Sequence, residues 1–293
     1  MSTTTGTRYG FISWAIFLSL SLIWGSSFIL MKEGLKTLSA YQVASIRILS
    51  AGLVLLPVAV KQLNKIPYQK LHLIILSGLT GSFIPAFLFC IAETRIDSSL
   101  TGILNSLTPI FSIILGVLFF KATVHWKKFL GVLIGFAGLC VLFLGKGKIE
   151  LNFLSYASLV LLATICYGFN VNLVNRYLKE VGSLNIAAFA FAFLTIPSFC
   201  ILAYTGFFSL PLLEKPFLVS TSASTVLGVM GTAVATIIFY MLVKRTGVLF
   251  TSMVTYAIPV VAIFWGVIAN EGITLLEVVS LVIILGGVAL TTK

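Results

Sequence analysis

The sequence predicts an all-α membrane protein of ten transmembrane helices, arranged as two inverted five-helix repeats with both termini in the cytoplasm. Its composition points to the membrane, because 59% of the 293 residues are hydrophobic and only 9% are charged, against about 25% in a soluble domain. The mean hydropathy is +1.13. These values exclude a soluble globular protein, a disordered chain and a nucleic-acid-binding domain, although the net charge is +11. Since each span needs about 20 apolar residues, ten spans leave no room for a sizeable soluble domain.

Ten apolar stretches follow one another along the chain, and each ends where charged residues, Pro or Gly gather. Alternating hydrophobicity over ten-residue units is absent, which argues against a membrane β-barrel. A signal peptide is the alternative for the first stretch, but its long apolar run, Trp24 and the lack of a small-x-small cleavage site favour a span. The stretches cover residues 12–30, 41–60, 71–92, 99–120, 126–144, 151–173, 185–206, 217–242, 248–269 and 274–291. The breaks fall at residues 32–34, 61–70, 93–97, 121–128, 145–150, 176–182, 211–216, 244–247 and 271–272.

The distribution of Lys and Arg predicts the orientation. With the N-terminus inside, twelve basic residues lie in inner segments and six in outer segments, and this excess follows the positive-inside rule. The inner residues are Arg8, Lys61, Lys65, Lys70, Lys121, Lys127, Lys128, Arg176, Lys179, Lys244, Arg245 and Lys293; the outer ones are Lys32, Lys36, Arg95, Lys146, Lys148 and Lys215. We therefore expect an integral protein of the cell (inner or plasma) membrane with both termini cytoplasmic.

The two halves of the chain resemble each other. When residues 78–118 are shifted by 150 onto residues 228–268, nine of 41 positions are identical. These include Gly78 with Gly228, and Pro109 with Pro259. The sequence thus predicts two five-helix repeats, 1–147 and 148–293. Because five is odd, the copies are inverted in the membrane, an architecture of many secondary transporters.

Several motifs in order carry a family resemblance. They are the segment Trp24-Gly25-Ser26-Ser27-Phe28, Arg47, Pro109, Pro259, Glu271 and the Gly-rich fifth and tenth stretches. With the repeat, they make the chain resemble the EamA-type members of the drug/metabolite transporter superfamily over essentially its whole length. The resemblance implies a ten-helix carrier that exports or exchanges small metabolites, often amino acids. One departure is Lys121, where the family often has an acidic residue.

Polar residues on helix faces are the candidates for substrate binding. Thr101, Asn105, Thr108 and Ser112 recur every three or four residues and share one face of the fourth stretch. The alternative reading is helix packing, which small polar residues also serve. Trp24 fits an interfacial belt or an outer gate equally well. The expected substrate-binding residues are Trp24, Ser27, Asn105, Tyr167, Asn170, Thr236, Tyr240 and Tyr256.

Three further features carry a hinge or a charge. Pro109 and Pro259 each remove a backbone hydrogen bond at mid-span, so we expect hinges, with static kinks as the alternative. Arg47 is the one charge in the middle of a span; it either captures a carboxylate or makes a structural bond. Because the resemblance implies a peripheral second helix, we expect the structural role. Glu93 is read as a loop charge paired with Arg95, or as a proton acceptor.

These observations predict a secondary transporter of small neutral or zwitterionic metabolites such as amino acids. The alternatives are a sugar-phosphate or nucleotide-type carrier of the same superfamily, and a channel. No enzyme is expected, because the chain lacks the nucleophile, metalloprotease and P-loop motifs. We expect no cofactor and no metal, since Cys90, Cys140, Cys166 and Cys200 are scattered within spans. The expected partners are the substrate and the lipid bilayer. Gly131, Gly135, Gly286 and Gly287 are expected to pack within a monomer, with a homodimer contact as the alternative.

Overall fold

The protein is all-helical wherever its structure is described. The computed structural model describes residues 10–65, 68–122, 130–131, 133–135, 137–138, 141, 151–269, 272 and 274–292. The helices are α1 (Phe11–Gly34), α2 (Ala40–Lys61), α3 (Leu71–Gly78), α4 (Ile84–Ala92), α5 (Ser98–Asn105), α6 (Thr108–Phe120), α8 (Leu151–Tyr177), α9 (Ser183–Tyr204), α10 (Lys215–Gly228), α11 (Ala235–Ser252), α12 (Val254–Ile268) and α13 (Leu275–Thr292). Two π-helical segments, η3 (Leu79–Phe83) and η5 (Val229–Val234), join α3 to α4 and α10 to α11. Short 3-10 turns lie at Leu63–Lys65 (η1), Tyr68–Lys70 (η2) and Phe207–Ser209 (η4).

Eight helical runs among the described residues are long and apolar enough to cross a membrane. They are Phe11–Gly34, Ala40–Lys61, Tyr68–Ala92, Leu100–Phe120, Leu154–Tyr177, Ser183–Tyr204, Lys215–Val248 and Phe250–Ile268. They agree with the expected stretches to within a few residues, and α13 occupies the last one. The stretch expected at 126–144 lies largely outside the described residues, as do Arg8, Glu271 and Lys293. Ten spans therefore remain a prediction.

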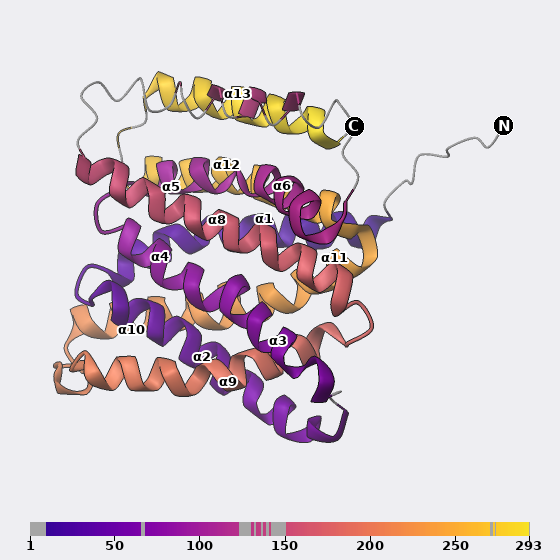
Figure 1. Ribbon diagram of the computed structural model, residues 1–293. Coiled ribbons are helices and arrows are strands. Elements are labelled where there is room, and N and C mark those ends of the chain that lie inside the picture. Colours follow the sequence, from indigo (N-terminus) through magenta and orange to yellow (C-terminus); the bar gives the residue numbers. More distant parts are fainter. Residues whose placement is uncertain are drawn as a thin grey trace.

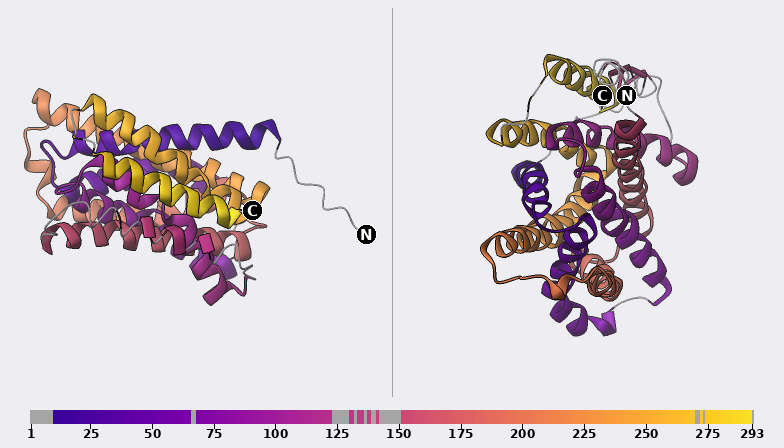
Figure 2. Two further views of the ribbon diagram at one scale, coloured as in Figure 1. Left: turned by 90° about the horizontal axis from the view of Figure 1, so that it is seen from above. Right: turned by 90° about the vertical axis from the view of Figure 1, so that its left-hand side faces the viewer.

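The helices run side by side in one bundle, with α13 and α9 on opposite flanks (Figures 1 and 2). The most extensive contacts join α2 to α9, α6 to α8, and α1 to α12. Large apolar side chains face outward, for example Leu53, Ile196 and Phe264, which are 55%, 69% and 60% exposed. An apolar outer surface is typical of helices that contact the hydrocarbon core of a lipid bilayer.

The two π-helical segments stand 150 residues apart, which is the shift that aligns the halves of the sequence. One begins directly after Gly78 and the other directly after Gly228. A π-helical turn accommodates an extra residue and widens the helix locally, and such turns often lie at functional sites. Both segments contribute to the cavity described below.

Glycine allows a close contact between the fifth and the tenth apolar stretches. A Cβ added to Gly287 of α13 would lie 2.5 Å from the backbone nitrogen of Gly135 and 2.7 Å from the carbonyl oxygen of Gly131. Because real Cβ contacts are longer, only glycine permits this approach. Of the four glycines expected to pack within one chain, Gly131, Gly135 and Gly287 meet in this contact, whereas a Cβ added to Gly286 meets nothing within 4 Å.

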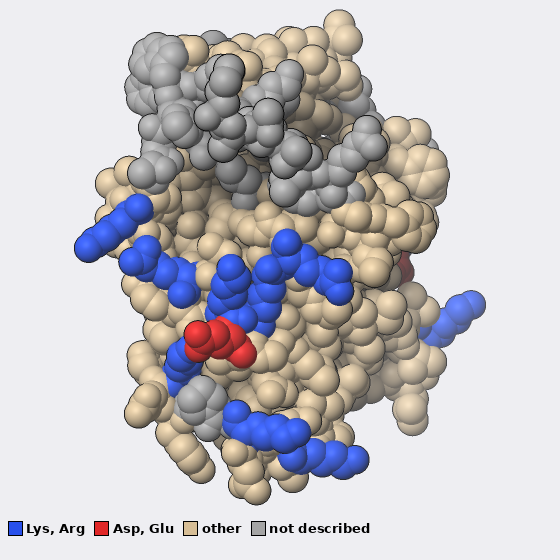
Figure 3. All heavy atoms as spheres, turned by 90° about the vertical axis from the view of Figure 1, so that its right-hand side faces the viewer, with Lys and Arg blue, Asp and Glu red and all other residues tan. Residues whose placement is uncertain are grey.

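Basic side chains gather at the end of the bundle where α1 begins and α13 ends (Figures 1 and 3). Lys70 Nζ lies 3.3 Å from Glu180 Oε2. Lys244 donates to the carbonyl of Val181, and Arg176 donates to the carbonyl of Phe120 at 2.6 Å. These bonds tie the ends of α3, α6, α8 and α11 together.

Candidate functional site

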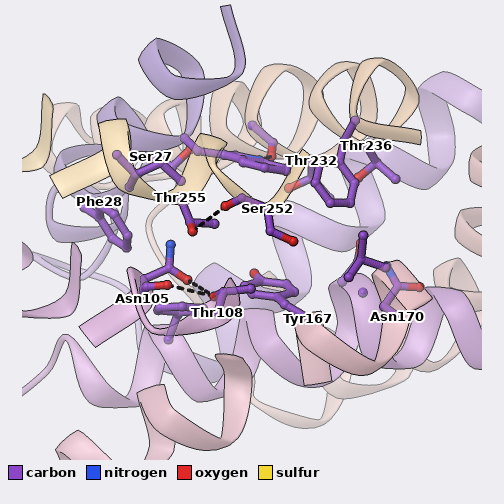
Figure 4. A pocket seen from close by; sticks show the side chains of 18 of the residues that line it. Ser27, Phe28, Asn105, Thr108, Tyr167, Asn170, Thr232, Thr236, Ser252 and Thr255 are labelled. Atoms are coloured by element: carbon purple, nitrogen blue, oxygen red, sulfur yellow. Dashed lines mark hydrogen bonds between the residues drawn. The ribbon is translucent and has the colours of Figure 1, made fainter. Parts of the chain in front are cut away.

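A buried cavity lies between the helices, with walls from both halves of the chain (Figure 4). The space between the lining atoms, counted together with the open space at its mouth, is about 830 Å³. Its lining residues are Trp24, Ser27, Phe28 and Met31 of α1, Arg47 of α2, Gly81 and Ser82 of η3, Phe89 of α4, Asn105 of α5, Thr108 of α6, Tyr167, Asn170 and Val171 of α8, Gly231 and Thr232 of η5, Thr236, Phe239, Tyr240 and Ser252 of α11, and Thr255 and Ile258 of α12.

Seven of the eight expected binding residues meet in this one cavity: Trp24, Ser27, Asn105, Tyr167, Asn170, Thr236 and Tyr240. Tyr256 is not part of the lining. Its neighbour Thr255 faces the cavity, and consecutive residues of an α-helix point about 100° apart. A role of Tyr256 in binding therefore stays a prediction without support from this arrangement.

One side of the cavity is held by a hydrogen-bond network of three side chains from different spans. Ser77 Oγ donates to Asn170 Oδ1 at 2.7 Å and lies 2.9 Å from the hydroxyl of Tyr240. Asn170 Nδ2 donates to the same hydroxyl at 3.4 Å. All three residues are buried. Since polar groups in an apolar interior are costly unless they are bonded, the network fixes α3, α8 and α11 against one another.

The fourth span is broken beside the cavity. Helix α5 ends at Asn105 and α6 begins at Thr108. Pro109 therefore lies in the first turn of α6, where a missing N–H costs little, and its role as a hinge stays a prediction. The carbonyl of Asn105, which Pro109 leaves without a backbone donor, accepts a hydrogen bond of 2.7 Å from the Thr108 hydroxyl.

Pro259 behaves differently from its repeat partner, because it lies inside α12. Its missing N–H frees the carbonyl of Thr255, one turn earlier, and the Thr255 side chain lines the cavity. The Thr255 hydroxyl donates to the carbonyl of Ser252 at 2.8 Å. Pro259 thus leaves one turn of α12 in the cavity wall without its backbone hydrogen bond, while Pro109 lies at the beginning of a new helix.

Arg47 also belongs to the cavity wall, which the sequence did not lead us to expect. Its Nε donates to Thr232 Oγ1 at 2.6 Å, a structural bond of the kind expected. However, α2 is not peripheral, because the guanidinium lines the cavity and is only 7% exposed. Which side of a helix faces the cavity depends on the helices packed against it, and the sequence alone does not reveal these neighbours.

Aromatic rings cover much of the remaining wall, and sequence reasoning missed the three phenylalanines among them. Trp24 and Phe239 lie 5.1 Å apart between centroids, Phe28 and Phe89 6.0 Å, and Phe89 stacks on Tyr167 at 5.9 Å. The chain contains 24 Phe, so Phe alone gave no signal. The cavity thus offers aromatic faces, hydroxyls, amides and one guanidinium.

The expected position of Glu93 is corrected by the structure. Glu93 is 2% exposed, whereas Arg95 is exposed. Glu93 follows the last residue of α4 and packs into the bundle, so it is not a solvated loop charge. Cys90, Cys166 and Cys200 are free thiols, and the described residues hold no cluster of metal-binding side chains.

Apolar spans around a buried polar cavity define a helical membrane protein, and the comparison with known families makes the class specific. The model of the EamA-like transporter family matches residues 12–144 and again residues 154–293. The chain therefore belongs to the EamA-like transporter family.

Its relatives are named as transporters. The uncharacterized transporter YdfC of Bacillus subtilis is 28% identical, over 92% of this chain and 87% of its own. A probable amino-acid metabolite efflux pump of Escherichia coli is 28% identical, over 55% of this chain and 52% of its own. A probable terminal-alkyne amino-acid exporter of Streptantibioticus cattleyicolor is 24% identical, over 85% and 82%. A solved crystal structure shares the fold, with a TM-score of 0.66, 16% identity and 96% coverage of both chains.

Proposed function

We propose that the protein is a secondary transporter that exports or exchanges small neutral or zwitterionic metabolites, such as amino acids, by alternating access. The observation that carries this proposal is the buried cavity, in which hydroxyls, amides and aromatic rings from both halves of the chain face one space. The names of the efflux pump and the exporter among its relatives support the substrate class.

The proposed architecture is ten helices in two inverted repeats, residues 1–147 and 148–293. The family model matches once in each half, and each half carries a π-helical segment at the corresponding position. Inverted repeats suit alternating access, because exchanging the conformations of the two halves opens the site to the other side at similar energy. We place both termini in the cytoplasm of the cell membrane and treat the monomer as the working unit.

Counterflow in proteoliposomes tests the transport proposal. Vesicles loaded with an unlabelled amino acid should take up the labelled one along a saturable curve. The Asn105→Ala variant should lower uptake at least tenfold, because the amide of Asn105 lies in the cavity wall. Asn64→Ala is the matched control, since Asn64 is exposed in η1, remote from the lining residues. Flux that rises linearly with concentration would instead identify a channel, and saturable uptake confined to phosphorylated solutes would favour the sugar-phosphate alternative.

The turn of α12 that lacks a backbone hydrogen bond at Pro259 is the proposed hinge. Pro259→Ala restores an N–H donor for the carbonyl of Thr255 and stiffens α12, so exchange should slow severalfold while the affinity for substrate stays the same. Pro197→Ala is the control, because Pro197 lies inside α9, which adds no residue to the cavity. Equal exchange rates in both variants would mark Pro259 as a static kink.

A further inference from the structure

The cavity contains one charged side chain, for which the part of the chain that the structure describes offers no ion pair. Arg47 is the one charged residue among those that line it, and it is only 7% exposed. Ion pairs among the described residues include Lys32 with Asp97, Lys36 with Glu33 and Lys70 with Glu180. None of these pairs includes Arg47. A guanidinium held among apolar spans without an anion is costly, so its retention there calls for an explanation.

The contacts of Arg47 use only part of its guanidinium. Nε donates to Thr232 Oγ1 at 2.6 Å. Nη1 faces the sulfur of Met31 at 3.9 Å, and a thioether is a weak acceptor. Tyr167 lines the same cavity. A guanidinium has five N–H donors in a planar fork that matches two carboxylate oxygens, and these contacts leave part of that fork open to the cavity.

The backbone around Arg47 holds it in place. A Cβ added to Gly228 would clash with the carbonyl oxygen of Arg47, so α2 packs directly on the end of α10, just before η5. Thr232, four residues after Gly228, then fixes Nε from the same segment. The group is therefore positioned before any ligand arrives, which lowers the cost of binding.

We infer that Arg47 binds the carboxylate of the transported molecule. This inference rests on the proposed transport function. It defines the substrate as a small carboxylic acid with an apolar body, such as an amino acid. The carboxylate pairs with the open side of the guanidinium, and the apolar body packs on the rings of Trp24, Phe89 and Phe239. Amides, sugars and simple amines lack the anion that the site requires.

Binding to the purified protein in nanodiscs tests the assignment with four probes that share a ring. The probes are L-phenylalanine, 3-phenylpropionate, L-phenylalaninamide and phenyl phosphate, and the measurement is the dissociation constant by calorimetry. The wild-type protein should bind the two carboxylates at least tenfold more tightly than the amide and the phosphate. Failure of both carboxylates to bind, or an amide affinity equal to that of L-phenylalanine, would overturn the assignment. Tighter binding of phenyl phosphate would overturn the choice of carboxylate.

Variants of Arg47 provide the second arm. Arg47→Gln should weaken L-phenylalanine binding at least tenfold and leave the amide unchanged. Arg47→Lys should fall between Arg47→Gln and wild type, because lysine keeps the charge and loses the fork. Arg95→Gln, at an exposed arginine, should bind like wild type. Undiminished carboxylate binding by a folded Arg47→Gln protein would refute the inference. If the Arg47→Gln protein does not fold, the inference is tested by the affinity of the Arg47→Lys protein for L-phenylalanine and by the affinities of the wild-type protein for the four probes.

Counterflow of the same probes separates this inference from the transport proposal. Binding that depends on Arg47 without any counterflow would refute transport and leave the carboxylate site standing. Counterflow of acid and amide at equal rates, unchanged in Arg47→Gln, would refute the carboxylate site and leave transport standing.

Discussion

The indole Nε1 of Trp24 donates a hydrogen bond of 3.0 Å to the carbonyl oxygen of Gly231. Trp24 lies on α1, in the first half of the chain, and Gly231 lies in the π-helical segment of the second half. A π-helical turn disturbs the regular backbone ladder, and here the indole supplies a donor to one of its carbonyls. The bond therefore joins the two halves of the chain at the cavity wall.

Replacing Trp24 by phenylalanine should destabilise the protein without emptying the cavity wall. Trp24→Phe keeps a ring beside Phe239 but removes the donor to Gly231, and an unsatisfied buried acceptor costs about 1–3 kcal/mol. Thermal unfolding in one detergent should show a lower midpoint. Trp14→Phe is the control, because Trp14 is 45% exposed and packs by its ring on Phe17 and Phe250. Equal midpoints for the two variants would contradict a stabilising role for the Trp24 bond.

The network of Ser77, Asn170 and Tyr240 should show energetic coupling. In a double-mutant cycle, Ser77→Ala and Tyr240→Phe remove the two hydroxyls that lie 2.9 Å apart. Interhelical hydrogen bonds in membrane proteins average about 0.6 kcal/mol and reach about 1.7, so we expect coupling in that range. The unfolding free energy of the four proteins in the cycle measures it. Ser77→Ala combined with Tyr204→Phe, at a tyrosine that is 93% exposed, should be additive. Additivity in the first cycle as well would mean that the network carries no coupling.

The positions of the eight spans found among the described residues followed from the sequence, since apolar composition and length decide which stretches can cross a bilayer. The polar face through Asn105 also identified part of the cavity, because a buried amide needs partners in any packing. Other features depended on contacts between distant segments. The break before Pro109, the burial of Glu93 and the turn of Arg47 toward the cavity each require knowledge of the neighbouring helices. For the π-helical segments, the sequence offers only one clue: the repeat aligns Gly78 with Gly228, the residues directly before them.

The contact between α13 and the segment around Gly135 should tolerate no side chain. Gly287→Ala would place a Cβ 2.5 Å from the backbone nitrogen of Gly135, and a backbone atom moves only if the helices separate. We expect a loss of about 1–3 kcal/mol of stability, as for other overpacked sites. Gly286→Ala is the control on the same helix, because a Cβ there meets nothing within 4 Å. Stability is measured by thermal unfolding at two protein concentrations. Equal effects of the two substitutions would contradict the packing, and a concentration-dependent loss would indicate a contact between two copies.

The basic end of the bundle should face the cytoplasm. Tyr68 lies in η2 with Lys70, which pairs with Glu180, and is 84% exposed. Leu213 lies beyond the far end of α9 and is 94% exposed. In a background with the four native cysteines replaced by alanine, a membrane-impermeant thiol reagent applied to intact cells should label Leu213→Cys at once. It should label Tyr68→Cys only after the membrane is permeabilised, since Lys and Arg near the spans are retained in the cytoplasm. The reverse pattern would place the basic end of the bundle outside the cell, which would contradict the proposed topology. Labelling of both sites from outside would contradict a span arrangement in which α9 separates Leu213 from the basic end.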